Sequence, residues 1–343
     1  MKRHLALSAM LATMASQSGS SADANFIELA GRTMGTTWSV KFPARQAAVQ
    51  AAESKRELQR LLDGLEQTFS TYRANSEISR FNTTPSTNWF PVTDHMAQVM
   101  EHALRVAGLT DGAFDPTVGP LVELWGFGPT RHSRVPTAGD IAKARTRVGW
   151  RKLELRAQPP ALRKTQPDVA IDLSGIAKGY AVDKMVELLR ARGLTNALAQ
   201  VGGETFGLGK PAPGRGWRVG IEQPLEQGGG VWEIVELSDR ALSTSGHTRN
   251  FRLLNGHRHH HLIDPRSATP ATHKADSVSV IAATATEADA LATALFVLGP
   301  EDGPALADKH RLKCVFLEQT GGQFVSRPSQ AFPKGVGDSL HRR

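Results

Sequence analysis

The sequence predicts a mixed α+β fold, and three observations carry that prediction. Apolar and polar residues alternate over residues 26–42 around Gly35, as in two strands joined by a turn. Apolar residues recur at helical spacing within residues 47–69, at Leu58, Leu61, Leu62, Leu65 and Phe69. A strand-like run precedes a helical stretch twice more. The run 169–173 precedes the helical stretch 179–192, and the run 278–282 precedes the helical stretch 286–298. We therefore expect mixed β-sheets packed by helices and exclude an all-α protein.

Start signals and loop composition place further elements in the first half of the chain. Thr93 and Asp94 form a helix start signal, and one apolar face then runs through residues 95–109. Two polar, proline-containing stretches, 129–136 and 156–164, predict surface loops. A helical stretch at 138–148 is expected between them.

The second half predicts a hairpin, a buried cysteine and a tail. Strand-like runs at 217–222 and 231–237 flank three glycines and indicate a hairpin. Cys314 is the one cysteine, so no intramolecular disulfide is possible, and its apolar neighbours predict a buried strand residue and not a nucleophile. Proline, glycine and charge dominate from Ser326 onward, so residues 327–343 are predicted to be a mobile, dispensable tail.

The N-terminus is typical of a secretory signal. Lys2 and Arg3 precede a modest apolar run over 5–15, and Ala22-Asp23-Ala24 supplies the small residues of a cleavage site. We expect residues 1–24 to be removed, residues 25–326 to form the functional domain, and the protein to be periplasmic. The signal region contains no cysteine for lipid attachment, and no stretch is long and apolar enough to predict stable membrane insertion.

The charge distribution argues against a nucleic-acid partner. The 343 residues include 41 Lys and Arg against 33 Asp and Glu, a formal net charge of +8. These basic residues are scattered and do not interleave with aromatic residues as in a single-strand binding groove. We interpret the excess as a solvated basic surface that also suits anionic substrates.

The segment 172–179, Asp-Leu-Ser-Gly-Ile-Ala-Lys-Gly, follows an apolar run and opens a helix. A glycine-containing turn before a helix leaves backbone N–H groups at the positive end of the helix dipole, where a phosphate binds well. Lys178 would add a mobile positive charge. The same pattern also fits a simple helix cap, so both interpretations stay open.

Asp289 and Thr293 form a second candidate pair. Their spacing of four residues places both side-chain oxygens on one face of a predicted helix. Carboxylate and hydroxyl oxygens are ligands for a hard cation such as Mg²⁺. A solvated or capping pair is the alternative.

Histidines gather at residues 257–261, close to hydroxyl residues at 243–245. A transition-metal site is one interpretation, because imidazole suits Zn and Cu. Adjacent residues on a strand point to opposite faces, however, so at most two of these rings could share a metal. A single histidine acting as a general base is the better use, because its ordinary pKa lies near working pH.

Taken together, these segments resemble the ApbE family of FAD:protein FMN transferases over about residues 31–299. The order of nine motifs carries the resemblance. They are Met34-Gly35-Thr36, Thr71-Tyr72 with Ser76–Ser79, Gly112–Thr117, Leu124–Phe127, Asp172–Asp183, Gly202-Gly203-Glu204, Ser243–Gly246, His261–Pro265 and Asp289–Thr293.

The resemblance implies an α+β, T-fold-like architecture with an FAD cleft between a smaller lobe and the main body. It implies an enzyme that takes FAD as substrate and Mg²⁺ as cofactor, transfers FMN to a Thr or Ser hydroxyl of an acceptor protein, and releases AMP. An acceptor flavoprotein subunit of a membrane or periplasmic redox system is the expected partner. The metal would be held by the Ala177 carbonyl, Asp289 and Thr293.

The resemblance also implies roles at the flavin nucleotide and at the acceptor. His261 is the candidate base, with His260 as the alternative. The residues implied at the nucleotide are Met34, Tyr72, Ala113, Phe114, Asp115, Ser174, Lys178, Asp183 and Ile263. Tyr72, Phe114 and Trp125 offer flat surfaces to the flavin or adenine, and the alternative for Phe114 and Trp125 is that they are core aromatics.

Two departures from the family pattern concern loops: Ser267-Ala268 replaces a common Thr-Gly, and His247 stands where an aromatic or acidic residue is common. Two other functions stay open, an FAD carrier and a Mg²⁺-dependent FAD pyrophosphatase. A dinucleotide-binding dehydrogenase and a serine hydrolase are disfavoured, because the spaced glycines of the first and the nucleophile elbow of the second are missing.

Overall fold

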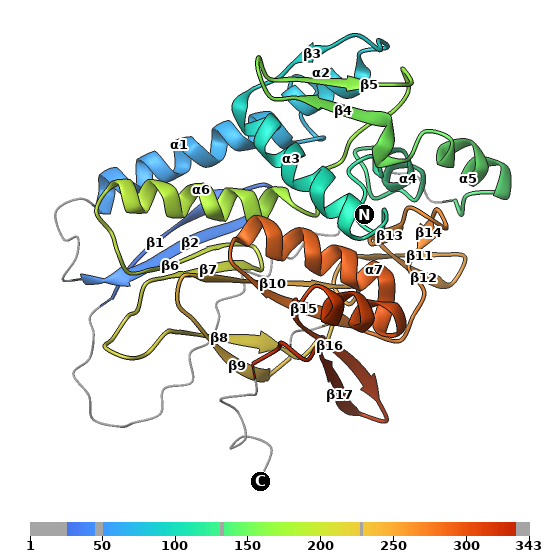
Figure 1. Cartoon of the computed structure of the whole chain (residues 1–343). Helices are drawn as coiled ribbons and strands as arrows, with labels where there is room; N and C mark the ends of the chain where they lie inside the picture. Colours follow the sequence, from blue (N-terminus) through green and yellow to red (C-terminus); the bar gives the residue numbers. More distant parts are fainter. Residues whose placement is uncertain (1–25, 45–50, 131–133, 227–228, 334–343) are drawn as a thin grey trace, which may run out of the picture.

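A computed structural model describes residues 26–44, 51–130, 134–226 and 229–333 (Figure 1). The expected signal segment 1–24 and the last ten residues of the expected tail lie outside this part of the chain. Among the described residues, no helix has the length and apolar character that a bilayer crossing requires.

An antiparallel sheet of eight strands forms the body of the molecule, in the order β1-β2-β6-β7-β10-β15-β16-β17. Every neighbouring pair is antiparallel, which identifies the fold as α+β and not as a parallel α/β fold. The strands are β1 (Phe26–Thr33), β2 (Thr36–Pro43), β6 (Ala197–Val201), β7 (Glu204–Leu208), β10 (Arg240–Gly246), β15 (Ser277–Ala282), β16 (Lys313–Thr320) and β17 (Gln323–Pro328).

Three helices cover one face of this sheet, and a hairpin covers the other (Figure 1). The helices are α1 (Ala51–Phe69), α6 (Ala177–Ala191) and α7 (Ala285–Lys309), and the hairpin is β8 (Trp217–Glu222) with β9 (Val231–Leu237). Neighbouring residues on a strand serve the two faces in turn: Ala241 packs in the helix-side core and Leu242 in the hairpin-side core. The predicted hairpin is thus confirmed.

The smaller elements gather at one end of the helical layer (Figure 1). One group consists of α2 (Glu77–Thr83), α3 (Asp94–Leu109) and the sheet of β3 (Phe90–Pro91), β5 (Ala161–Lys164) and β4 (Leu153–Arg156). The other consists of α4 (Gly119–Leu124), α5 (Ala138–Arg145), the short helix Trp150–Lys152, and the pairs β11 (Phe251–Leu254) with β12 (His257–His260) and β13 (Ile263–Asp264) with β14 (Thr269–Pro270).

Several sequence predictions are confirmed and three are wrong. Thr93 caps α3 as expected by accepting a hydrogen bond from Met96 N, and Cys314 is fully buried on β16. The predicted loop 156–164 is instead largely the β4–β5 hairpin, in which Lys164 is buried and donates to the Val169 carbonyl at 3.1 Å. The hairpin was missed because its strands are short and polar.

The predicted strand 169–173 does not form. Its apolar side chains are buried, but the backbone finds a side-chain partner and no neighbouring strand: the Asn82 amide donates to the Ile171 carbonyl at 2.8 Å and accepts from Ile171 N at 2.7 Å. The Asn82 side chain, 89 residues away in sequence, therefore satisfies the Ile171 backbone groups that a neighbouring strand would otherwise pair with. Local periodicity does not reveal such a partner.

The first residues of the predicted tail are also part of the fold. β17 extends to Pro328, Ser329 N donates to the Cys314 carbonyl at 2.8 Å, and Phe332 is 8% exposed in the hairpin-side core. The folded domain therefore extends beyond the predicted boundary at residue 326.

Candidate functional site

The start of α6 is built from backbone hydrogen bonds. Asp172 N donates to the Pro116 carbonyl at 2.8 Å, and the Asp172 carboxylate accepts from Ser174 N at 2.8 Å. The Leu173 carbonyl then accepts from both Ile176 N and Ala177 N, so the chain turns directly into the helix. Ile176, which precedes the helix, provides no side-chain cap. The turn predicted at 172–179 is confirmed, and Ser174 lies exposed on it.

The first turn of α6 lies against α7 because glycine allows close approach. A methyl group at Gly179 would be 2.2 Å from the Ala285 carbonyl oxygen and 2.8 Å from Asp289 Cβ. Gly179 N donates to Asp289 Oδ2 at 2.9 Å, and Asp289 is only 2% exposed. The carboxylate of α7 is thus held at the N-terminus of α6, where the helix dipole favours negative charge.

One turn further along α7, Thr293 lies beside the same loop. A methyl group at Gly175 would be 3.0 Å from Thr293 Oγ1 and 3.3 Å from a ring carbon of Phe114. The Thr293 hydroxyl is also 3.3 Å from the Ser245 hydroxyl of β10. Ala177 lies between Gly175 and Gly179, so this loop follows the face of α7 that carries Asp289 and Thr293.

These residues fit the oxygen donor set that a hard cation requires. Asp289 supplies a carboxylate, Thr293 a hydroxyl and Ala177 a backbone carbonyl. In the part of the chain that the structure describes, no three His, Cys, Asp or Glu side chains are grouped to hold a metal. The donor set therefore depends on one carboxylate with neutral oxygens, which suits Mg²⁺, an ion that keeps several waters in its shell.

Lys178 brings positive charge to the same place. Its ammonium contacts Glu204 Oε1 at 2.5 Å, with the Lys178 side chain partly exposed and Glu204 only 2% exposed. Burial raises the pKa of Asp289, and the nearby Lys178 charge opposes that rise. Burial would lower the pKa of Lys178, but the charges of Asp289 and Glu204 outweigh it and raise that pKa.

Two adjacent histidines have different environments. The His260 ring is stacked on His247 at 5.3 Å; its Nε2 lies 2.7 Å from the Ala271 carbonyl, and its Nδ1 accepts from Leu262 N at 3.3 Å. Both nitrogens are therefore engaged in holding the fold. Burial lowers the pKa of His260 to about 3, so the ring is neutral.

His261 has one nitrogen engaged and one available. Nδ1 is 3.1 Å from the Asn250 carbonyl, which requires a proton on Nδ1 and leaves the lone pair on Nε2. For Nε2 the structure records no partner among the described residues. Burial lowers the pKa of His261 to about 4 although the Asn250 carbonyl opposes the shift, and the charges of Lys178 and His247 lower it further. A neutral base with an accessible lone pair is what proton abstraction requires.

The residues expected at the flavin nucleotide divide into two groups, those that lie near the α6 loop or His261 and those whose side chains hold the fold. Tyr72 is 66% exposed, and its hydroxyl donates to the Phe127 carbonyl at 3.0 Å, while the Phe127 ring lies 6.3 Å from that of His261. Met34 occupies the β1–β2 turn with φ of 47°, and Thr36 after it lies beside Gly202, which in turn packs against Lys178. Phe114, although buried, reaches the Gly175 loop.

The second group has side chains committed to the fold. Asp115 accepts from Thr117 N and Thr117 Oγ1 and from Trp150 N, and burial raises its pKa. Both Asp183 oxygens hold the first turn of α7, accepting from Ala285 N and Thr286 N at 2.8 Å each. Ala113 is 1% exposed. Ile263 packs with Trp125 in a small separate core, and Trp125 donates to the Ala268 carbonyl.

Comparison with known proteins agrees with the motif order. The model of the ApbE family matches residues 34–316. The chain belongs to the ApbE family. It is 37% identical to the FAD:protein FMN transferase of Vibrio cholerae over 323 residues, covering 94% of this chain and 96% of that protein. It is 38% identical to the FAD:protein FMN transferase of Escherichia coli K12 over 307 residues, covering 89% of this chain and 87% of that protein.

Solved structures of the ApbE family have the same fold. The flavin transferase ApbE from Vibrio cholerae superposes with a TM-score of 0.82 at 37% identity, covering 90% of this chain and 98% of that one. The apo form of the Pseudomonas stutzeri flavinyl transferase ApbE superposes with a TM-score of 0.81 at 36% identity, covering 90% of this chain and 95% of that one. The α+β, ApbE-like architecture expected from the motifs is therefore confirmed.

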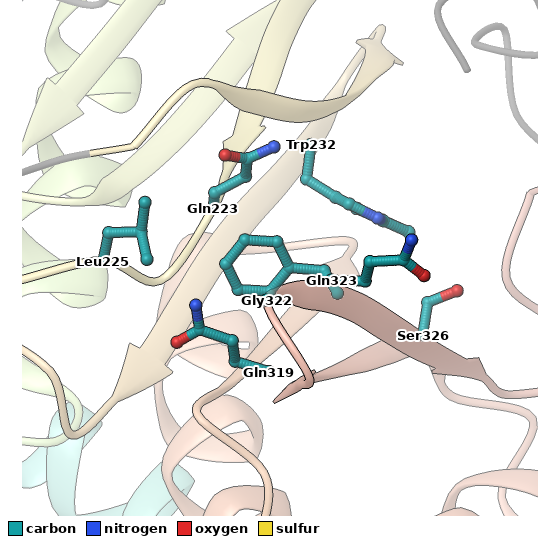
Figure 2. A pocket seen from close by; sticks show the side chains of 8 residues that line it. Gln223, Leu225, Trp232, Gln319, Gly322, Gln323 and Ser326 are labelled. Atoms are coloured by element: carbon teal, nitrogen blue, oxygen red, sulfur yellow. The ribbon is translucent and has the colours of Figure 1, made fainter. Parts of the chain in front are cut away.

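Two surface hollows can be compared with these motifs, and one of them shares Tyr180 and Asp183 with the segment Asp172–Asp183. Figure 2 shows the larger, about 650 Å³, lined by Gln223, Trp232 and Gln319 among others between the β8–β9 and β16–β17 hairpins. The second, about 320 Å³, is lined by residues of α3, α6 and the start of α7, including Asp183. Neither contains Asp289, Thr293 or His261 in its lining.

Sequence reasoning missed three participants of this ApbE-family site. The Gly202-Gly203-Glu204 motif gives no role for Glu204 from sequence alone, although Glu204 is the ion-pair partner of Lys178. The sequence predicts Gly175 and Gly179 only as turn residues, whereas their lack of side chains allows α7 to approach α6. Lys178 and Glu204 are 26 residues apart, and Gly179 and Asp289 are 110 residues apart, so neither contact leaves a local periodic signal in the sequence.

Proposed function

We propose that this chain transfers the FMN moiety of FAD to a Thr or Ser hydroxyl of an acceptor protein, with release of AMP and with Mg²⁺ as cofactor. The ApbE-family relatives named FAD:protein FMN transferase support the reaction class. The observation that carries the proposal to this chain is the contact between α6 and α7, which holds the Asp289 carboxylate against Gly179 N beside Lys178.

Asp289, Thr293 and the Ala177 carbonyl would hold the Mg²⁺. When bound, Mg²⁺ neutralises charge on pyrophosphate oxygens as the phosphoryl group is transferred. The chain itself adds Lys178, whose side chain is partly exposed, and the exposed Ser174 at the start of α6. Both suit the phosphate groups of FAD, because cations and helix N-termini attract phosphate oxygens.

His261 would remove the proton from the acceptor hydroxyl. Its Nδ1–H donates to the Asn250 carbonyl, so Nε2 presents the lone pair. The acceptor oxygen forms a bond to the phosphorus of the FMN half, the bond between that phosphorus and the bridging oxygen breaks, and AMP leaves. Because the engaged His260 cannot offer a lone pair without losing a structural hydrogen bond, His261 is the base we propose.

Of the three aromatic residues considered as stacking surfaces, one has an exposed ring. Tyr72 is 66% exposed, its hydroxyl donates to the Phe127 carbonyl at 3.0 Å, and the Phe127 ring lies 6.3 Å from that of His261. Phe114 and Trp125 are 4% exposed each and belong to cores, and Phe114 reaches the site only at the Gly175 loop. We therefore propose Tyr72 as the stacking surface.

The cellular context is part of the same proposal. The cationic start, apolar run and Ala22-Asp23-Ala24 of the N-terminus favour export to the periplasm. An exported flavin transferase would act on a flavoprotein subunit of a membrane or periplasmic redox system.

One incubation separates the candidate reactions. The purified chain is mixed with FAD, Mg²⁺ and an acceptor domain that bears a candidate Thr, and the acceptor's intact mass and the released nucleotides are measured. An acceptor heavier by one FMN moiety, with equimolar AMP, supports the transferase. Free FMN and AMP with an unmodified acceptor would identify the pyrophosphatase, and intact bound FAD across several acceptors would identify the carrier.

A further inference from the structure

The Lys178–Glu204 ion pair is arranged in a way that stability alone does not explain. Glu204 is 2% exposed, and its Oε2 is buried with no hydrogen-bond partner in the described part of the chain. A buried carboxylate with only one oxygen paired is costly, and an apolar pair of similar size is often at least as stable. The arrangement is therefore more consistent with a functional constraint on the position of Lys178.

The surroundings of Glu204 fix the ion pair in place. Glu204 follows the turn Gly202-Gly203, in which Gly202 has φ of 61°. A methyl group at Gly202 would be 3.4 Å from Glu204 Oε2, 3.4 Å from Thr36 Cγ2 and 3.6 Å from Lys178 Cδ. The turn therefore covers both the carboxylate and the aliphatic part of the lysine.

A second buried atom without a partner, the Ser243 hydroxyl oxygen, belongs to β10, the strand that pairs with β7. The β7–β10 ladder pairs Leu242 with Thr205, so continuing the register makes Ser243 the cross-strand neighbour of Glu204. The Ser243 hydroxyl is fully buried and also has no partner among the described residues. The structure records no hydrogen bond from this hydroxyl to Glu204, and among the described residues Lys178 is the only cation in an ion pair with Glu204.

Lys178 has a second carboxylate within electrostatic reach. The charges of Asp289 and Glu204 both raise the pKa of Lys178, yet within the described residues Lys178 forms its ion pair with Glu204 and none with Asp289. The geometry thus separates two carboxylates that attract the same ammonium. A Lys178–Asp289 ion pair would occupy the carboxylate proposed as the Mg²⁺ ligand.

We infer that Glu204 is a positioning residue, which holds the Lys178 ammonium away from Asp289 so that Asp289 stays available to Mg²⁺. The inference rests on the proposed function for the identity of the metal and of FAD. It assigns to the Gly-Gly-Glu turn a role in metal loading, exerted through Lys178. Glu204 itself touches neither the metal nor the substrate in this account.

The test is a double-mutant cycle on FAD binding, without an acceptor. The fluorescence anisotropy of FAD is measured against Mg²⁺ concentration for the purified wild-type chain and for Glu204→Gln, Lys178→Gln and the double variant. Glu204→Gln is expected to raise the half-saturating Mg²⁺ concentration at least about tenfold, since a charge-assisted hydrogen bond to Asp289 must then be broken. In the Lys178→Gln background the same change is expected to have less than about a twofold effect.

A matched control distinguishes charge loss in general from this role. Glu187 also pairs with a lysine of α6, at 2.9 Å from Lys184, but its side chain is 59% exposed. Glu187→Gln is expected to leave the Mg²⁺ midpoint unchanged. Thermal unfolding of each variant shows whether it is folded. If Glu204→Gln fails to fold, the cycle uses Glu204→Asp, which keeps the charge on a shorter side chain and is expected to raise the Mg²⁺ midpoint when Lys178 is present but not in the Lys178→Gln background.

Three results would overturn the inference. One is an unchanged Mg²⁺ midpoint in folded Glu204→Gln, the second is an equal shift in the presence and absence of Lys178, and the third is wild-type FAD binding that does not depend on Mg²⁺. The proposed transfer reaction is judged separately, from FMN attached to the acceptor by the wild-type chain. Positive transfer with no Lys178–Glu204 coupling would therefore sink the inference and leave the function intact.

Discussion

The backbone N–H of Gly179 donates a 2.9 Å hydrogen bond to Asp289 Oδ2, and this bond joins the first turn of α6 to a residue of α7 that is 110 positions away in sequence. It fixes the carboxylate at the positive end of α6, beside Lys178. The arrangement of the whole candidate site depends on how closely these two helices approach.

The Gly179→Ala substitution tests that dependence. The new methyl group would lie 2.2 Å from the Ala285 carbonyl oxygen, so α6 and α7 must separate. We expect a loss of about 1–3 kcal/mol in the free energy of unfolding, the usual cost of overpacking, together with a large loss of FMN transfer. Urea denaturation and the mass assay measure the two effects.

Gly64→Ala is the matched control for that substitution. Gly64 is an exposed residue within α1, and a methyl group there meets nothing within 4 Å. Alanine should stabilise this helix by about 0.5–1 kcal/mol and leave transfer unchanged. Equal stability losses at positions 64 and 179 would contradict the role given to the α6–α7 contact.

His261→Gln is expected to reduce the rate of FMN transfer by about 10²–10⁴-fold, the usual contribution of a general base. FAD binding should be retained, because the base acts on the acceptor hydroxyl. Since the pKa of His261 is lowered to about 4, chiefly by burial, the base stays neutral down to that pH. An NMR titration of the His261 ring with a midpoint at or above 6.5 would rule this environment out.

His260→Gln should affect stability in a pH-dependent way. The folded-state pKa of His260 is lowered to about 3, whereas an unfolded histidine titrates near 6.5. Between these two pH values the unfolded chain therefore binds more protons than the folded chain. The contribution of His260 to the free energy of unfolding is lost as the pH falls. The cost of His260→Gln, measured by urea unfolding, should be largest at pH 8 and smaller at pH 5; a cost that grows on acidification would refute this.

The C-terminal boundary gives a truncation experiment. Removing residues 327–343 deletes Phe332, which is 8% exposed, and Ser329, whose hydroxyl donates to the Leu312 carbonyl at 2.7 Å. We expect this truncation to cost at least about 1.5–3 kcal/mol, the value of one buried Phe side chain. Removing only residues 334–343 is the control, and equal stability of the two truncated chains would contradict the revised boundary.

The sequence predicted the helices well because their faces have a local period. The apolar residues of α1 and the Thr93 cap of α3 are visible within one or two turns of chain. The interactions that build the site are not local. Three such interactions have no periodic signature in the sequence. They are the hydrogen bonds of Asn82 to Ile171, the ion pair of Glu204 with Lys178, and the hydrogen bonds by which Asp183 holds the start of α7.

The candidate site was found from motif order more than from spacing. Asp289 and Thr293, four residues apart, were expected on one helical face, but only the contacts of Gly175 and Gly179 show that Ala177 runs along that face. The choice between His260 and His261 likewise needed the tertiary partners of each ring. Sequence gave candidate residues, and three-dimensional contacts separated those with available groups from those that hold the fold.

Asp289 is the residue on which the proposed reaction depends most. The most direct measurement is the intact mass of an acceptor domain after incubation with FAD, Mg²⁺ and either the wild-type chain or Asp289→Asn. This variant keeps an oxygen for Gly179 N but loses the charge. Wild type should add one FMN moiety and release AMP, whereas Asp289→Asn should be slower by at least about 100-fold at any Mg²⁺ concentration, as for loss of a major electrostatic stabiliser. Asp168→Asn, at a carboxylate that is 58% exposed, should behave as wild type. Undiminished transfer by folded Asp289→Asn would contradict the account.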